Sequence, residues 1–267
     1  MSNGTITVRG EEIGYEQAKS MLVPELIAQE GNEARLADVP SRQMEDMAVI
    51  YRLDLGEMNG GHASIVVNND LMEHFGVTAE QLHEDMQANA PLTHPVSIRS
   101  MEEVLGEMMG GMPLPGPEPG QPYLFVASRQ DMFQGAGIMA YPDFFQQAAE
   151  KVGGDFFIQP SSIHEILLLP DDGSMGWQEL TNMVQSVNAS EVLPEERLSD
   201  NVFHFDAQDK VFERADKFEQ RQQKREKEME KSEGRHSVLK VLGQKKEECK
   251  EQPAKPGRGA KTAEAVI

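Results

Sequence analysis

The chain has a single cysteine, Cys249, among its 267 residues. A lone cysteine has no partner for an intramolecular disulfide, which excludes a disulfide-stabilised scaffold and suits a reducing compartment. No apolar run approaches the roughly 18 residues of a membrane span, and the first residues lack the basic and apolar regions of a signal peptide. We therefore expect a cytoplasmic protein that does not enter membranes.

Basic side chains are scarce over most of the chain. Residues 207–267 hold 16 of the 25 Lys and Arg and 12 of the 45 Asp and Glu, so residues 1–206 keep 9 basic and 33 acidic side chains. The formal charge is near −24 for residues 1–206 and near +4 for the remainder. Because Lys and Arg neutralise backbone phosphates in nucleic-acid complexes, we do not expect the acidic body to bind nucleic acid directly.

The chain also lacks the spacings that hold metals and phosphates. Its seven histidines include no His-Glu-x-x-His pair, because His83-Glu84 and His164-Glu165 each lack the second histidine. No glycine pair is followed by Lys-Ser or Lys-Thr or opens a G-x-G-x-x-G turn, so these pairs predict turns. We expect no metal and no cofactor.

Patterned apolar residues, in contrast, are plentiful enough for a core. Residues 15–30 have apolar positions at helical spacing, interrupted at Pro24, and predict a helix. Residues 49–55 alternate like a strand, and residues 62–67 follow a glycine-rich turn as its hairpin partner. Helix starts of the capping type are indicated at Asn68 to Asp70, at Thr78 with Gln81 and at Ser100 with Glu103.

Residues 110–122 are rich in proline and glycine and predict a linker or a long surface loop. A strand at residues 123–127, a second at 136–140 and a helix opened by Pro142 follow it. This strand-strand-helix order repeats that of the first part of the chain. The repetition suggests an internal duplication.

Residues 153–170 carry the clearest structural pattern. Gly153-Gly154 ends the preceding helix, and residues 155–159 predict a strand. Pro160-Ser161-Ser162 is expected to turn the chain, and residues 163–169 form a strand too apolar to face water. Such a strand belongs in the middle of a sheet.

A helix around residues 177–187 and a last strand at 201–206 complete the acidic body. The expected fold is α/β or α+β, with a mixed sheet, helices and a C-terminal helical extension. The expected segments are an N-terminal helical segment at 1–44, a first strand-strand-helix half at 45–109, the linker at 110–122, a second half with the central hairpin at 123–206, a charged helix at 207–233 and a mostly disordered basic tail at 234–267.

The hairpin also holds the best cluster of reactive side chains: Ser161, Ser162, His164 and Glu165. Serine, histidine and glutamate are the residue types of a nucleophile, its base and the group that orients the base. On a strand, however, Glu165 points to the face opposite His164, and no Gly-x-Ser-x-Gly elbow exposes a hydroxyl. A hydrogen-bonded turn is the competing interpretation.

Two further segments could bind a partner. Methionines cluster at Met101, Met108, Met109 and Met112, and methionine fills cores but also forms adaptable binding surfaces. In the basic tail, a short apolar patch stands among charged residues and predicts a docking peptide that folds on a partner. The residues of this patch are Val238, Leu239, Val241 and Leu242.

Several ordered motifs resemble a known family. They are GGDFFIQPSSIHEILLLPDDG, VNASEVLPEERLSDNVFHFD, LMEHFGVTAEQLHEDMQANAP and MEEVLGEM. Together they are similar to a domain-of-unknown-function family, number 5688, of anaerobic Gram-positive bacteria, over about residues 45–206. The resemblance implies a bacterial cytoplasmic protein, often encoded on integrative or conjugative elements, and it supplies no activity and no catalytic residues.

These observations predict an accessory protein of a bacterial mobile element that binds a protein partner without catalysis. One alternative is a hydrolase that uses Ser162 and His164. The other is an acidic DNA mimic that inhibits a nucleic-acid enzyme by occupying its basic groove.

Overall fold

The structure is a computed structural model that describes residues 4–58, 60–116 and 123–231. The chain divides into two units, residues 1–218 and residues 219–267. In the second unit, the described residues 219–231 are helical and mostly exposed. The tail segment 234–267 lies outside the described residues, and so does its predicted docking patch.

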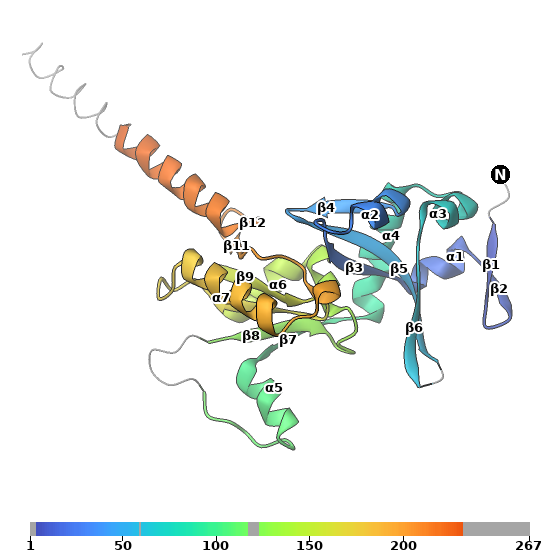
Figure 1. The fold of residues 1–267 in the computed structure, drawn as a ribbon, viewed down its shortest axis with the longest axis horizontal. Coiled ribbons are helices and arrows are strands. Elements are labelled where there is room, and N and C mark those ends of the chain that lie inside the picture. Colours follow the sequence, from blue (N-terminus) through green and yellow to red (C-terminus); the bar gives the residue numbers. More distant parts are fainter. Residues whose placement is uncertain (1–3, 59, 117–122, 232–267) are drawn as a thin grey trace, which may run out of the picture. The chain divides into compact units, whose positions relative to one another are not determined.

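The first sheet is built around one long strand, β5 (Met47–Met58). Strand β3 (Leu22–Ala28) pairs along β5, while β4 (Ser41–Met44) and β6 (Gly61–Val66) pair with its successive halves, all antiparallel. Alternate β5 residues face two apolar clusters, as expected for a strand covered on both sides. The hairpin predicted from residues 49–67 is thereby confirmed (Figure 1).

The predicted helix at residues 15–30 is wrong. The chain forms one helical turn, α1 (Tyr15–Ala18), a 3₁₀ turn, η1 (Lys19–Met21), and then strand β3. Pro24 explains the difference, because proline lacks the N–H that a helix interior needs but is tolerated in an edge strand. The segment 1–44 is therefore not a helical segment, since it also contains the strands β1 (Thr5–Val8) and β2 (Glu11–Gly14) and the short helix α2 (Glu33–Asp38).

The second sheet has six antiparallel strands and two covering helices (Figure 1). Phe156 and Ile158 share the main apolar core with Phe144 of helix α6, whereas Phe157 packs with Leu180 of helix α7. The two helices therefore cover opposite faces. The elements are β12 (Val211–Arg214), β11 (Phe203–Asp206), β9 (Phe156–Ser162), β10 (Glu165–Pro170), β8 (Phe125–Arg129) and β7 (Val96–Ser100), in spatial order, with α6 (Phe144–Val152) and α7 (Trp177–Ser190).

The hairpin β9–β10 lies in the middle of this sheet, as predicted, but its turn is displaced. The turn is Ile163-His164, and residues 160–162 belong to β9. β11 pairs with β9 only as far as Ile158, so Pro160 stands where no N–H is needed on that side. His164 is therefore a turn residue and not a strand residue.

The second predicted strand of this half, residues 136–140, is instead a buried 3₁₀ helix, η2 (Gly135–Ala140). Gly137 passes so close to β3 that an added Cβ would lie 2.3 Å from the Pro24 carbonyl oxygen. The segment fills space between the two sheets instead of joining one. The strand-strand-helix order is consequently not repeated, and the predicted duplication is wrong.

Two predicted boundaries are also wrong. Strand β7 and helix α5 (Met101–Met108) precede the linker, yet β7 pairs with β8 and so belongs to the second sheet. The boundary between segments 45–109 and 123–206 therefore does not separate two halves. Segment 207–233 begins with strand β12, where Phe212 stacks on Phe145 at 4.7 Å between ring centroids, and its helix starts only at residue 215.

The predicted helix starts are confirmed. Asn68 caps α3 (Asn69–Phe75) by accepting from the Leu71 N–H. Thr78 caps α4 (Ala79–Thr93) in the same way, and Ser100 and Glu103 form a complete capping box at α5. With its three sheets and surrounding helices, the described chain has the mixed α/β fold that the sequence predicts.

Candidate functional site

The junction between the two sheets contains a buried aspartate, Asp54. It lies at a β-bulge, where the β5–β6 register shifts between Asp54 and Gly56. Gly56 has a left-handed φ of 69°, and its N–H donates to Asp54 Oδ1 at 2.8 Å. The bulge thus fixes one carboxylate oxygen and turns the side chain, which is 4% exposed, toward the second sheet.

Three nitrogen-bearing side chains surround this carboxylate. His62 Nε2 of β6 lies 2.8 Å from Oδ1, although not at a hydrogen-bonding angle, and its ring stacks on Phe133 at 4.1 Å. His94 Nε2, at the C-terminal end of α4, lies 3.1 Å from Oδ2. Arg129 Nη2, at the end of β8, donates to Oδ2 at 2.8 Å. Elements of both sheets therefore meet at one carboxylate.

Arg129 has no exposed surface and connects a second carboxylate to the first. Its Nη2 also donates to Asp131 Oδ2 at 2.5 Å. Among the residues that the structure describes, its Nε and Nη1 find no hydrogen-bond partner. We call Asp54, His62, His94, Arg129 and Asp131 the junction cluster.

Asp54 is ionised despite its burial. Burial opposes ionisation, but the contacts with His94, Arg129 and the Gly56 N–H outweigh it and lower the pKa of the carboxyl well below its usual range. With neutral histidines, the junction cluster then carries two negative charges and one positive charge. Burial also raises the pKa of the nearby Tyr141 phenol, which donates to the His94 carbonyl oxygen at 3.0 Å.

The junction cluster opens on a surface cavity of about 370 Å³. His94 and Asp131 line this cavity with Thr93, Pro95 and Gln130. The Thr93 hydroxyl lies 2.9 Å from His94 Nδ1, so the imidazole is held between a hydroxyl and a buried carboxylate. An imidazole in this arrangement can transfer a proton or bind a metal ion.

Sequence reasoning missed this cluster. Asp54, His94 and Asp131 are separated by about 40 residues at each step, and none of them belongs to a short motif. The signal available in the sequence was Asp54 followed two positions later by Gly56 within a mostly apolar strand, which indicates a bulge. Its partners depend on the pairing of β7 with β8, which the sequence did not predict.

The predicted hairpin residues are arranged differently. His164 Nδ1 accepts from the Gln134 N–H at 3.3 Å, and its Nε2 lies 3.6 Å from Glu196 Oε1. Ser162 Oγ accepts from the His164 backbone N–H at 3.1 Å. Ser161 ends β9 with Ser162, and Glu165 begins β10 opposite Ser162. Within the described residues no serine hydroxyl hydrogen-bonds the His164 ring, so the structure brings that ring to Glu196 instead.

Helix α5 presents a second candidate surface. Gly110 and Gly111 both have φ near 84°, and the chain then returns along the helix, with residues 112–116 beside it. Gly106 permits this return, because an added Cβ would lie 2.5 Å from the Met112 carbonyl oxygen. The returning segment and the helix line an open pocket of about 430 Å³.

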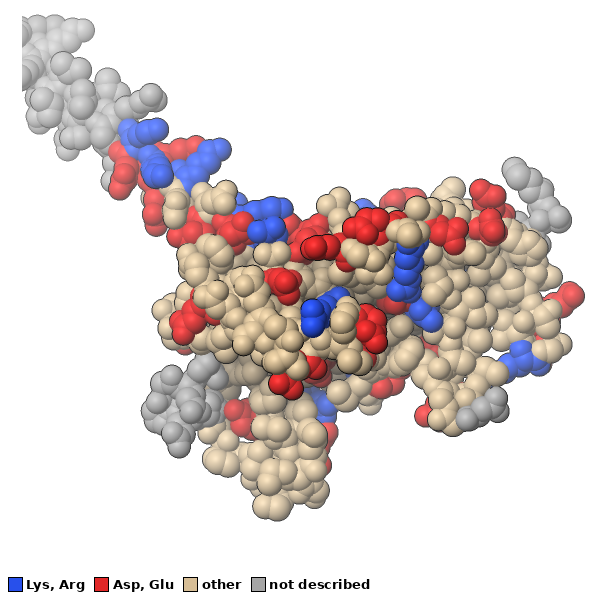
Figure 2. Space-filling view, in the orientation of Figure 1, with Lys and Arg blue, Asp and Glu red and all other residues tan. Residues whose placement is uncertain are grey.

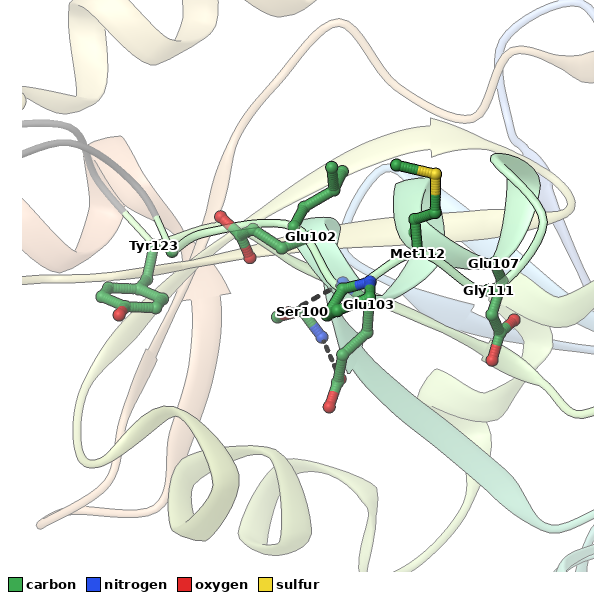
Figure 3. Close-up of a pocket in the computed structure, with 11 residues that line it drawn as sticks. Ser100, Glu102, Glu103, Glu107, Gly111, Met112 and Tyr123 are labelled. Atoms are coloured by element: carbon green, nitrogen blue, oxygen red, sulfur yellow. Dashed lines mark hydrogen bonds between the residues drawn. The ribbon is translucent and has the colours of Figure 1, made fainter.

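The side chains around this pocket are apolar, acidic and exposed. Figure 3 shows Met112 and Tyr123 at opposite sides, with the capping bonds of Ser100 and Glu103 between them. Met112, at 57% exposure, and Tyr123, at 52%, line the pocket, whereas Leu105 at 43%, Met108 at 79% and Met109 at 58% are exposed on the helix or directly after it. We call these five apolar residues the α5 surface.

The comparisons with known proteins define the family. The chain matches the family of unknown function DUF5688 over residues 8–207, which extends the resemblance expected from residues 45–206. No curated protein and no solved structure matches the chain. In the described part of the chain, no helix is both long and apolar enough to cross a membrane. Because the match covers most of the chain, this protein belongs to the DUF5688 family.

Proposed function

We propose that this protein binds a protein partner through the α5 surface and acts by binding, without catalysis. The supporting observation is the exposure of Met108, Met109 and Met112 on one short helix and the segment that follows it. Exposed apolar side chains gathered in one place are typical of interaction sites. Methionine is well suited to such a site, because its flexible and polarisable side chain adapts to different partners.

The charge around the α5 surface indicates the kind of partner. Glu102, Glu103 and Glu107 line the pocket with Met112 and Tyr123, and Glu107 pairs with Arg99. An apolar centre with an acidic border complements a segment that has apolar anchors flanked by Lys or Arg. The proposed partner therefore presents a basic amphipathic helix, which would lay its apolar side on the methionines.

Site-specific photo-crosslinking tests this proposal. A photoreactive residue replaces Met109, and control proteins carry it at Met183 of α7, which is 48% exposed, or at the exposed Glu33 of α2. Crosslinking in bacterial cells that encode the protein should give one dominant adduct from position 109. The variant M108E/M109E should lose that adduct while keeping its unfolding transition.

Other crosslinking patterns contradict the proposal or support its alternatives. Adducts at Met183 but not at Met109 would exclude the α5 surface. Figure 2 shows Asp and Glu side chains along one edge of the first unit, over α2 and β4. A nucleic-acid enzyme captured at Glu33 would support the DNA mimic instead.

Three other parts of the proposal rest on sequence. Truncation after residue 233 tests the docking patch Val238, Leu239, Val241 and Leu242, whose loss should weaken partner capture if the tail contributes. The cytoplasmic accessory role in a mobile element rests on the family resemblance. The hydrolase alternative requires a serine hydroxyl at the His164 ring, and ester hydrolysis that S162A abolishes would support it.

A further inference from the structure

We infer that Asp54, His94 and Asp131 form a binding site for a divalent transition-metal ion, Zn²⁺ or Mn²⁺, beside the cavity of about 370 Å³ that His94 and Asp131 line. One ligand atom from each residue can be chosen so that all three lie within 4.8 Å of one another. One imidazole and two carboxylates are the mixed nitrogen and oxygen ligands that first-row divalent ions accept. The inference is independent of the α5 surface.

Each proposed ligand is held by a second contact, as the ligands in built metal sites are. The Gly56 N–H fixes Asp54 through Oδ1 at 2.8 Å, and the Phe133 N–H fixes Asp131 through Oδ1 at 3.2 Å. Thr93 Oγ1 lies 2.9 Å from His94 Nδ1. In every case the atom that remains, Oδ2 of each aspartate and Nε2 of the histidine, is the one that faces the cluster.

The Thr93 hydroxyl contacts His94 Nδ1 and two backbone carbonyl oxygens. The Thr93 hydroxyl lies 3.3 Å from the Asn89 carbonyl oxygen and 3.4 Å from that of Ala90, and it donates to them. When it does so, His94 Nδ1 supplies the proton of the Thr93–His94 contact, which is one of the two neutral tautomers open to the imidazole. When the imidazole proton is on Nδ1, Nε2 presents a lone pair to Asp54 Oδ2 at 3.1 Å, and a bound cation then replaces the hydrogen bond that otherwise stabilises this carboxylate.

Arg129 provides a separate indication that a charged group is accommodated here. Its Nη2 contacts both Asp54 Oδ2 and Asp131 Oδ2, so these two oxygens already bind one positively charged group. One positive charge leaves the two carboxylates with a net negative charge. Its Nε and Nη1 are fully buried and have no hydrogen-bond partner within the described residues, so they remain available to donate to a bound anion or water.

The test uses the full chain with Cys249→Ser, so that the tail thiol does not bind zinc. The protein is stripped with a chelator and titrated with ZnCl₂ and, separately, MnCl₂ by isothermal calorimetry. One ion per chain should bind, and Tm should rise with metal concentration because the ion binds the folded state. Absence of binding by both ions would overturn the inference.

Matched variants locate the ion. D131N removes a partly exposed ligand, so it is expected to fold, and it should weaken binding at least tenfold, as should H94Q. T93V leaves all three ligands but removes the hydroxyl that contacts His94, and it should weaken binding by roughly tenfold to a hundredfold. H164Q, which changes a histidine outside the cluster, should bind as the parent does. Equal affinity in D131N, H94Q and the parent would show that the ion binds elsewhere and would refute the site.

Discussion

The junction cluster and the β9–β10 hairpin each place a histidine near a carboxylate, but they do so in different environments. His94 faces Asp54, whose side chain is 4% exposed, at 3.1 Å. His164 faces Glu196, whose side chain is 33% exposed, at 3.6 Å. Charged contacts that water does not reach are strong and costly to break, whereas exposed ones contribute little.

The contrast also concerns how each site is assembled. The hairpin residues are neighbours in sequence, and that proximity made them the obvious candidates. The junction residues come from β5, α4 and the end of β8, so they meet only when both sheets form. In this protein, the charged contacts that are shielded from water join residues that lie far apart in the sequence.

The largest predicted effect is that of Asp54→Ala. It leaves Arg129 fully buried without its main partner, and breaking a buried ion pair in this way costs about 3–5 kcal/mol. Urea denaturation followed by circular dichroism measures the loss. A cost under about 1 kcal/mol would mean that water or another group compensates the guanidinium. Breaking the buried junction contact would then destabilise the fold no more than breaking the exposed hairpin contact.

Gly135→Ala tests the close packing between the β9–β10 hairpin and the junction cluster. An added Cβ would lie 2.4 Å from the His164 carbonyl oxygen and 2.8 Å from the Arg129 backbone nitrogen. Backbone atoms cannot move aside cheaply, so a destabilisation of about 1–3 kcal/mol is expected. Gly61→Ala is the control, because nothing lies within 4 Å of its added Cβ and its φ is not positive. Similar unfolding midpoints for the two variants would refute this close packing.

The acid sensitivity of the fold should be traceable to Asp54. Its pKa is lower in the folded chain than in the unfolded chain, so its stabilisation is complete above about pH 5 and is lost progressively as the pH falls through and below the unfolded value of about 3.9. Asp54→Asn should therefore flatten the decline of unfolding free energy in this acid range. Parallel curves for the parent and D54N would contradict the assignment.

The smallest predicted effect is that of Glu196→Gln. The His164–Glu196 contact is long and partly exposed, so its loss should cost no more than about 1 kcal/mol. Thermal unfolding of E196Q beside D54A makes the comparison direct. A cost as large as that of D54A would mean that the His164–Glu196 contact stabilises the fold as much as the buried junction contact does, which would contradict the difference proposed between them.

Local patterns predicted local structure well. The caps at Asn68, Thr78 and Ser100 and the hairpin β5–β6 depend on neighbouring residues, and they form as the sequence indicates. The errors arose where tertiary packing outweighed local pattern. The apolar spacing of residues 15–30 suits a helix, but a strand with Pro24 at the sheet edge buries the same side chains.

The candidate site was missed for the same reason. Its geometry requires β7, a short strand directly before α5, to pair with β8 beyond the proline-rich linker. No periodicity in five residues reveals such a long-range pairing, and the buried Arg129 looks like an ordinary surface arginine in sequence. The α5 methionines were visible in the sequence, but only the structure distinguishes their exposure from core filling.

A double-mutant cycle between Asp54 and Arg129 tests most directly whether the buried charges of the junction cluster compensate each other. Unfolding free energies are measured for the parent, D54A, R129M and the double variant, and for the corresponding variants H164A and E196A. We predict that D54A/R129M costs less than the sum of its single variants by about 1–3 kcal/mol, with a coupling near zero for the hairpin pair. Additive costs at Asp54 and Arg129 would contradict the account.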